Sequence, residues 1–150
     1  MIDIRPVRYD STDGGALVAR AMADLAQRYG GGGDQTPVDP AQFVPPAGEF
    51  LVGYLDGVPV ACGGWRGNGT DAEVKRMYTA PDARHRGIAS AVLRALEDSA
   101  RRYGRRRMIL ETGPAQPEAI ALYEKLGYHR IEDFGHYRDA PGVRSYGLVL

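Results

Sequence analysis

Two arginines and a glycine at the start of a predicted helix carry the clearest chemical signal in this chain. Arg84, Arg86 and Gly87 follow a strand-like segment and precede a long amphipathic stretch. Backbone N–H groups in the first turn of a helix point outward at the positive end of the helix dipole, which makes an anion site. Guanidinium groups match phosphate oxygens, and glycine lets the backbone approach a ligand because it has no Cβ. The spacing therefore predicts a pyrophosphate-binding turn.

A second motif further along the chain gives this turn a context. Residues 84–89 read Arg-His-Arg-Gly-Ile-Ala, and residues 119–128 read Ala-Ile-Ala-Leu-Tyr-Glu-Lys-Leu-Gly-Tyr. They resemble, in the expected order, the R/Q-x-x-G-x-G/A and A-x-x-L-Y-x-K-x-G-F/Y motifs of the GNAT superfamily of N-acetyltransferases. The resemblance covers most of the chain after about Glu49. It implies acetyl-coenzyme A (acetyl-CoA) as the cofactor and an amine as the acceptor.

The resemblance also implies which residues hold the cofactor. The backbone of Met77 and Thr79 would pair with the pantetheine arm as a neighbouring strand does, and the Met77 N–H would donate to the oxyanion formed during transfer. Gln116 stands where many family members have asparagine. Glutamine keeps the amide group but moves it outward by one methylene. The expected cofactor-binding residues are Met77, Tyr78, Thr79, Arg84, His85, Arg86, Gly87, Ile88, Ala89, Ser90, Gln116 and Ala119.

Tyr123 is the expected general acid. Its phenol, with an ordinary pKa of about 10, suits protonation of a departing thiolate. The residue also lies on the apolar stripe of a predicted helix with Leu122 and Leu126, so a core position is the alternative. A buried phenol needs a hydrogen-bond partner, which a thiol sulfur can be, and the family motif has a tyrosine here.

Two carboxylates are candidates for the general base that takes a proton from the amine. Glu73 is the leading candidate, because it lies on the strand before the phosphate turn, where some family members have a catalytic glutamate. An ion pair with Lys75 on the same strand face is the alternative for Glu73. Glu111 on the neighbouring strand is the second candidate. An unperturbed carboxylate is a weak base for an ammonium, so burial or a relaying water is needed.

The acceptor is expected to bind near residues 30–46, a segment rich in Gly and Pro that carries acceptor specificity in the family. A plain connecting loop is the alternative for this segment. The side chains that are candidates to line an acceptor pocket and attract a carboxylate are Arg8, Tyr29, Arg76, Tyr137 and Arg138. A surface position is the alternative for each of them. The sequence leaves open whether the acceptor is a small amine, an amino-acid-like molecule or an exposed amine of a protein.

Charge and composition restrict the classes of function. Lys and Arg together number 19, as do Asp and Glu, so no net charge draws the chain to nucleic acid or to a membrane. The basic run from Arg101 to Arg107 is expected to be a solvated helix end, with one or two arginines available for the 3′-phosphate of CoA. No apolar stretch reaches the length of a membrane span. Cys62 is the single cysteine, so the chain has no internal disulfide, which suits a reducing cytoplasm. Cys62 is expected to be a small core residue. The histidines lack metal-ligand spacing, so no metal is expected.

Hydrophobic periodicity predicts the elements that must position these residues. Strands are expected over residues 2–8, 49–55, 58–65, 71–79, 107–112, 128–131 and 143–150, and helices from residues 10–13 to 29, over about 87–103 and from 117 to a stop at 127. Asp56-Gly57 predicts a tight hairpin, and residues 66–70 predict a second turn. Because a helix joins the strand at 71–79 to the strand at 107–112, these two strands should be parallel.

These elements predict one domain over residues 1–150 with a mixed α/β (α+β) fold, in which helices flank a mainly antiparallel sheet with a central parallel step. The expected function is an acetyl-CoA-dependent N-acetyltransferase that works by direct attack of the amine on the thioester. The rival class is a non-catalytic acyl-CoA-binding sensor or regulatory module. The sequence also leaves a homodimer open.

Overall fold

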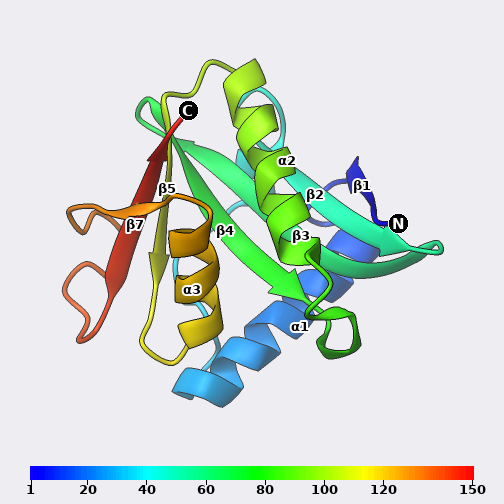
Figure 1. Cartoon of the computed structure of the whole chain (residues 1–150), viewed down its shortest axis with the longest axis horizontal. Helices are drawn as coiled ribbons and strands as arrows, with labels where there is room; N and C mark the ends of the chain where they lie inside the picture. Colours follow the sequence, from blue (N-terminus) through cyan, green and yellow to red (C-terminus); the bar gives the residue numbers. More distant parts are fainter.

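Seven strands and three α-helices make up the computed structural model, which describes residues 1–150 (Figure 1). The strands are β1 Asp3–Pro6, β2 Gly48–Leu55, β3 Val58–Asn68, β4 Asp71–Thr79, β5 Arg107–Thr112, β6 His129–Arg130 and β7 Arg144–Val149. The helices are α1 Thr12–Tyr29, α2 Ile88–Arg102 and α3 Pro117–Lys125, with short 3₁₀ helices at Pro40–Phe43 and Pro81–Ala83. None of the helices combines the length and the apolar character that crossing a membrane requires.

One sheet contains all seven strands in the order β1-β2-β3-β4-β5-β7-β6. Every neighbouring pair is antiparallel except β4 and β5, which are parallel, as the intervening helix predicts. The structure thus confirms the mainly antiparallel sheet with a central parallel step. β4 and β5 pair only at Ala72–Met108 and Glu73–Ile109, and they diverge beyond these pairs (Figure 1). A gap therefore opens between the carboxyl ends of the two strands.

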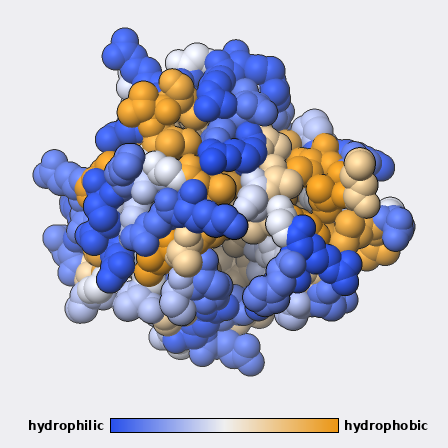
Figure 2. Space-filling view, viewed as in Figure 1, coloured by the Kyte–Doolittle hydropathy of each residue, from blue (hydrophilic) through white to orange (hydrophobic).

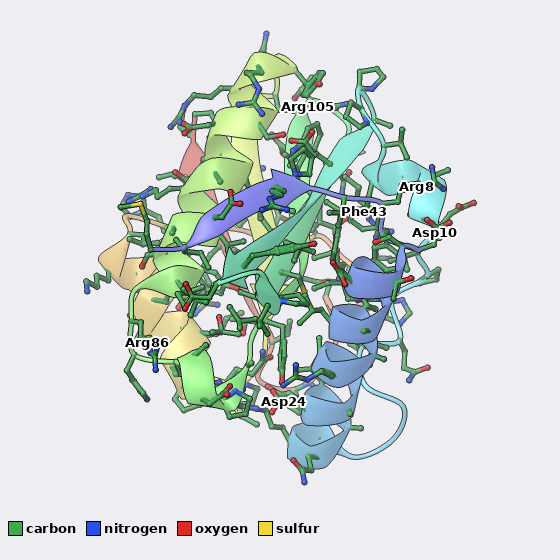
Figure 3. All side chains as sticks on the ribbon, turned by 90° about the vertical axis from the view of Figure 1, so that its right-hand side faces the viewer. Arg8, Asp10, Asp24, Phe43, Arg86 and Arg105 are labelled. Atoms are coloured by element: carbon green, nitrogen blue, oxygen red, sulfur yellow. The ribbon has the colours of Figure 1, made fainter.

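Helices on both faces hold the sheet that contains this gap. In the side view, α2 lies on one face of the sheet and α1 on the other (Figure 3). The buried stripe of α2, which includes Val92 and Leu96, packs into the main core with Trp65. The Trp65 indole donates to Ser99 Oγ at 2.8 Å, so the buried N–H is satisfied. Leu17 of α1 packs in a smaller cluster on the other face.

The face of the molecule shown in Figure 2 is predominantly polar. Hydrophilic side chains cover most of the face in Figure 2, and hydrophobic side chains gather in separate patches. Apart from Met1 at the N-terminus, the most exposed large hydrophobic side chains, Val58 and Val149, belong to different elements. Scattered exposure of this kind is ordinary on a protein surface and does not mark a docking face.

The structure corrects several predicted element ends. β3 continues to Asn68, through residues that were expected to form a turn, because Arg66–Asn68 pair with the first residues of β4. Only residues 69–70 remain for the turn. β1 is shorter than expected and ends at Pro6, which has no N–H for a strand ladder. β6 is reduced to two residues, whereas the ends of α2 lie within one residue of the prediction.

Candidate active site

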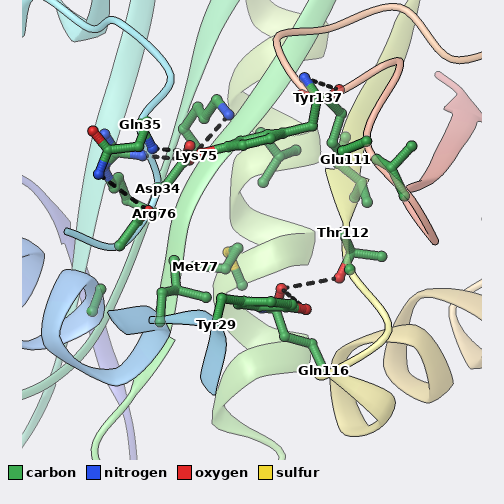
Figure 4. Close-up of a pocket in the computed structure, with 18 of the residues that line it drawn as sticks. Tyr29, Asp34, Gln35, Lys75, Arg76, Met77, Glu111, Thr112, Gln116 and Tyr137 are labelled. Carbon is green, nitrogen blue, oxygen red and sulfur yellow. Dashed lines mark hydrogen bonds and ion pairs between the residues drawn. The ribbon is translucent and has the colours of Figure 1, made fainter. Parts of the chain in front are cut away.

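A cavity of about 370 Å³ lies where β4 and β5 diverge (Figure 4). Both strands, the C-terminal half of α1, the start of α3 and two long loops line it. Its lining residues are Ala21, Leu25, Tyr29, Gly33, Asp34, Gln35, Val74, Lys75, Arg76, Met77, Leu110, Glu111, Thr112, Gly113, Pro114, Gln116, Tyr123, Tyr137, Ala140, Pro141 and Val143. Figure 4 separates two ends: a charged end with Asp34, Lys75 and Glu111, and a less charged end with Met77 and Gln116.

A bulge in β4 shapes the wall of the cavity. Cys62 of β3 faces Tyr78, but Gly64 faces Lys75, so one residue of β3 is opposed by two of β4. Arg76 lies in this bulge with φ of 62°, which is rare for a residue with a side chain. The bulge interrupts regular alternation, and both Arg76 and Met77 line the cavity as a result.

Contacts on three sides hold Arg76 in this conformation. Its carbonyl accepts a hydrogen bond from the Cys62 thiol at 3.2 Å, its Nε donates to the Tyr9 hydroxyl at 3.1 Å, and its Nη1 pairs with Asp34 at 2.7 Å. Burial raises the pKa of Cys62 to about 12, so the thiol stays protonated and acts as a donor. Cys62 is therefore the buried core residue that the sequence predicts.

Tyr123 projects from α3 into the cavity lining, although nearly all of the residue is buried. Its ring packs near Tyr128 and Tyr146, and its hydroxyl has no hydrogen-bond partner within the chain. Burial raises the pKa of Tyr123 to about 12. The phenol thus stays protonated throughout the physiological range, and its O–H remains available as a donor.

Gln116 lies at the same end of the cavity, at the N-cap of α3. Its Oε1 accepts from the Tyr29 hydroxyl at 3.3 Å and from Thr112 Oγ1 at 3.5 Å (Figure 4). Tyr29 also accepts the Ala115 N–H at 3.0 Å. The end of α1 is thereby tied to the loop between β5 and α3, and the Gln116 amide is oriented from both sides.

The turn that the sequence predicts to bind pyrophosphate lies at the N-terminus of α2. Gly87 is the N-cap with φ of 75°, and the backbone N–H groups of residues 85–90 have no hydrogen-bond partner within the chain. Arg86 points outward from this turn in Figure 3. Arg84 instead turns back, since its Nε donates to the Thr79 carbonyl at 2.9 Å and its guanidinium lies over the Tyr78 ring. The residues expected to form this turn thus lie together, but the Arg84 guanidinium is bonded within the chain.

Asp34 organises the charged end of the cavity. Its carboxylate pairs with Lys75 at 3.2 Å and with Arg76 at 2.7 Å, and it accepts both the N–H and the hydroxyl of Thr36. Burial alone would raise the pKa of Asp34. The Lys75 ammonium and the Thr36 hydrogen bonds outweigh burial and bring that pKa below its ordinary value. Asp34 was not among the predicted site residues, because it lies in a Gly- and Pro-rich segment without periodicity.

The two candidate bases occupy different surroundings. Glu73 does not line the cavity; it is buried and pairs with Arg66 at 3.3 Å and Lys75 at 3.7 Å. Glu111 lines the cavity, with Oε2 accepting the Tyr137 N–H at 3.1 Å and Oε1 buried without a partner. Burial raises the pKa of Glu111, and the Lys75 ammonium opposes this only in part. Of the two carboxylates, only Glu111 lines the cavity.

Of the residues expected to line an acceptor pocket, the structure brings three to the cavity: Tyr29, Arg76 and Tyr137. Arg138 is absent from the lining. Arg8 is exposed, pairs with Asp10, and lies on the outside of the molecule in Figure 3.

The basic run lies at the far end of α2 from the phosphate turn, about 22 Å away for a helix of this length. This separation argues against the expected contact with the 3′-phosphate of CoA. Arg101 and Arg102 are solvent-exposed, as predicted. Arg105 and Arg107 are not simply solvated, since Arg105 lies over the Trp65 ring and Arg107 pairs with Asp71 at 3.0 Å. No three His, Cys, Asp or Glu residues are grouped in a way that would hold a metal ion.

Comparison with known proteins agrees with the two motifs of the sequence. The chain belongs to the acetyltransferase (GNAT) family, whose model matches residues 19–128. An uncharacterized N-acetyltransferase of Escherichia coli K12 is 32% identical over 127 residues, covering 77% of this chain and 76% of that protein. An IAA acetyltransferase of Azospirillum brasilense is 40% identical over 95 residues, so the match spans 62% of that relative's length.

Solved structures share the whole fold. A provisionally assigned acyl-CoA N-acyltransferase of Klebsiella pneumoniae superposes with a TM-score of 0.84 at 28% identity, over 100% of this chain and 98% of that one. A GNAT family acetyltransferase of Elizabethkingia anophelis, solved with acetyl-CoA bound, gives a TM-score of 0.70 at 16% identity, over 99% and 98% of the two chains. The second likeness, at this identity, is one of fold.

Proposed function

We propose that this protein is an N-acetyltransferase that moves the acetyl group of acetyl-CoA to a primary amine by direct attack. One observation carries the proposal: a free tyrosine hydroxyl and a carboxylate line the same cavity at the divergent pair β4 and β5. The free N–H groups at the start of α2 support the cofactor assignment, because they suit a pyrophosphate. Bound there, acetyl-CoA supplies an activated acetyl thioester.

The residues of the cavity divide the proton transfers between them. Glu111 would take the proton that the amine loses as its nitrogen bonds to the acetyl carbon. Tyr123 would give its proton to the sulfur as the carbon–sulfur bond breaks. A phenol with a pKa of about 12 is a weaker acid than a thiol in water. The same buried setting disfavours a thiolate, which reduces this difference.

The remaining residues would bind and orient. Met77 and Thr79 lie at the carboxyl end of β4, beside the gap, where their backbone can pair with an extended pantetheine arm. The Met77 N–H would donate to the thioester carbonyl oxygen. Gln116, held by Tyr29 and Thr112, would contact the arm from the α3 side. Glu73 would act indirectly, by pairing with Lys75 and so setting the charge next to Glu111.

A direct test is release of free CoA thiol from acetyl-CoA in the presence of a panel of primary amines, with the acetylated amine identified by mass spectrometry. We expect thiol release that depends on the amine and is equal in amount to the acetylated product. Binding of acetyl-CoA without thiol release for any amine would contradict the proposal and support the non-catalytic acyl-CoA sensor. Acetylation of the protein itself by acetyl-CoA alone would contradict direct attack.

A further inference from the structure

Tyr137 forms a bridge across the charged end of the cavity. Its hydroxyl accepts the backbone N–H of Gln35 at 2.5 Å, and its own N–H donates to Glu111 Oε2 at 3.1 Å. Figure 4 places the Tyr137 ring between Gln35 and Glu111. One residue of the loop between β6 and β7 is thus bonded both to the loop after α1 and to β5.

Both ends of this bridge are anchored to the diverging strands. On one side, Asp34 next to Gln35 pairs with Lys75 and Arg76 of β4. On the other side, Glu111 is itself a residue of β5. Contacts therefore run from β4 through the Gln35 N–H and Tyr137 to β5, over the gap between the two strands. The gap is closed at this end by hydrogen bonds rather than by strand pairing.

The loop that carries Tyr137 is held in place by its own contacts. Turn hydrogen bonds run from the Arg138 N–H to the Gly135 carbonyl and from the Ala140 N–H to the Tyr137 carbonyl. The His136 ring packs edge-on against the Tyr137 ring, with centroids 4.8 Å apart. Gly135 sits so close to the Glu111 carboxylate that a Cβ there would collide with it. The loop between β6 and β7 thus packs closely against Glu111. This loop and the loop after α1 both contribute to the cavity lining.

We propose that Tyr137 is a specificity-determining residue that restricts the acceptor to a small primary amine, of about the size of a free amino acid, and excludes amines carried on polypeptides. The inference rests on the proposed function and names its acceptor class. The cavity of about 370 Å³ has to hold the thioester end of the cofactor as well as the acceptor. A polypeptide would have to pass the bridge to reach Glu111, whereas a small amine fits beneath it.

The test compares two classes of acceptor in the wild type and in Tyr137→Phe. The substitution keeps the ring and the backbone N–H to Glu111 and removes only the oxygen that accepts from Gln35. The acceptors are a panel of free amino acids and short alkylamines, and a fifteen-residue synthetic peptide with a free N-terminus and one lysine. The readout is kcat/KM from thiol release. Tyr103→Phe, a change to a half-exposed tyrosine beside Trp65, is the matched control.

We expect the wild type to act on its best small amine at least about tenfold faster than on the peptide. In Tyr137→Phe the ratio of peptide to small-amine kcat/KM should rise by about tenfold, the factor that one hydrogen bond controls, while the control leaves it unchanged. Gln35→Pro removes the donor of the same bond and should shift the ratio in the same direction. Its effect separates loss of the bridge from any change in the ring.

Equal wild-type activity on the peptide and on small amines would overturn the inference and leave the proposed function standing, since thiol is still released. An unchanged ratio in both Tyr137→Phe and Gln35→Pro would overturn it as well. No thiol release from either class, in protein whose melting temperature acetyl-CoA raises, would overturn the proposed function and with it the inference.

Discussion

Tyr123 combines a buried ring with a hydroxyl that no group of the chain uses. Tyr123→Phe keeps the packing against Tyr128 and Tyr146 and removes only the proton donor. We expect kcat to fall roughly 10- to 1,000-fold, within the range for one acid catalyst, with little change in the affinity for acetyl-CoA. Steady-state kinetics and calorimetric titration of acetyl-CoA measure the two quantities. An unchanged kcat, with chemistry shown to be rate-limiting, would make Tyr123 a core residue.

The Glu111 carboxylate is the proposed general base, and its burial in the folded protein affects stability as well. Because its pKa is raised in the folded protein, its contribution to stability is present below the unfolded pKa and is lost as pH rises through the folded pKa. Ionised Glu111 therefore destabilises the fold at neutral pH. Glu111→Gln should leave the melting temperature at pH 7 unchanged or higher, and this difference should vanish near pH 4. The same variant should lower kcat/KM roughly 100-fold at neutral pH and recover in part as the amine deprotonates unaided.

Glu73→Gln is the matched control for Glu111→Gln, because Glu73 is buried but lies outside the cavity lining. It breaks the ion pairs with Arg66 and Lys75, so we expect a loss of about 1–3 kcal/mol in the free energy of unfolding. Thermal melts and pH–rate profiles of both variants distinguish the roles. A rate loss confined to acid and neutral pH in Glu73→Gln, with none in Glu111→Gln, would return the base to Glu73.

The sequence identified those site residues that belong to local motifs. Gln116 and Tyr123 have a fixed offset from each other on one helix, so a motif places them together at the cavity. Which of Glu73 and Glu111 lines the cavity could not be predicted, because it depends on how β4 and β5 diverge. Asp34 lies far along the chain from Lys75, and no local pattern indicates that long-range pairing.

Among the secondary-structure elements, the N-terminus of α2 offers the most direct test of cofactor binding. Gly87 has φ of 75° and open space around its missing Cβ, so Gly87→Glu brings some backbone strain and a negative charge to the proposed pyrophosphate site. We expect the rise in melting temperature caused by acetyl-CoA to disappear. Gly104→Glu is the control, since Gly104 has φ of 74°, is equally open, and follows the other end of the same helix. If Gly87→Glu binds acetyl-CoA as the wild type does, the cofactor assignment is wrong.

The elements were largely predictable, and their irregularities were not. Alternating and helical patterns predict β4, α2 and β5 and the parallel relation of the two strands, because each is a property of a short segment or of its connection. The bulge at Arg76 is a property of the register between β3 and β4, which no single segment specifies. The adjacent Gly63-Gly64 on β3 was the one local sign, since glycine in a strand often marks a bulge or a close approach.

At the scale of the whole molecule, β4 and β5 pair at Ala72–Met108 and Glu73–Ile109, and just beyond these pairs the Tyr137 bridge joins the two strands across the start of the gap. The sheet and the helices on both of its faces hold this frame. The less charged end, where we propose that the thioester binds, and the charged end, where we propose that the acceptor binds, are therefore parts of one opening in the sheet. Transfer within a ternary complex needs such an arrangement, because the amine and the thioester must meet without a covalent enzyme intermediate.

We propose that the thioester lies in this opening with its sulfur at Tyr123. A crystal structure of the complex with a thioether analogue of acetyl-CoA measures this directly. We expect the pantetheine arm to run along β4 at Met77 and Thr79, with the sulfur within hydrogen-bond reach of the Tyr123 hydroxyl. We expect the pyrophosphate to contact the N–H groups after Gly87. An analogue bound elsewhere, or with its sulfur remote from Tyr123, would contradict it.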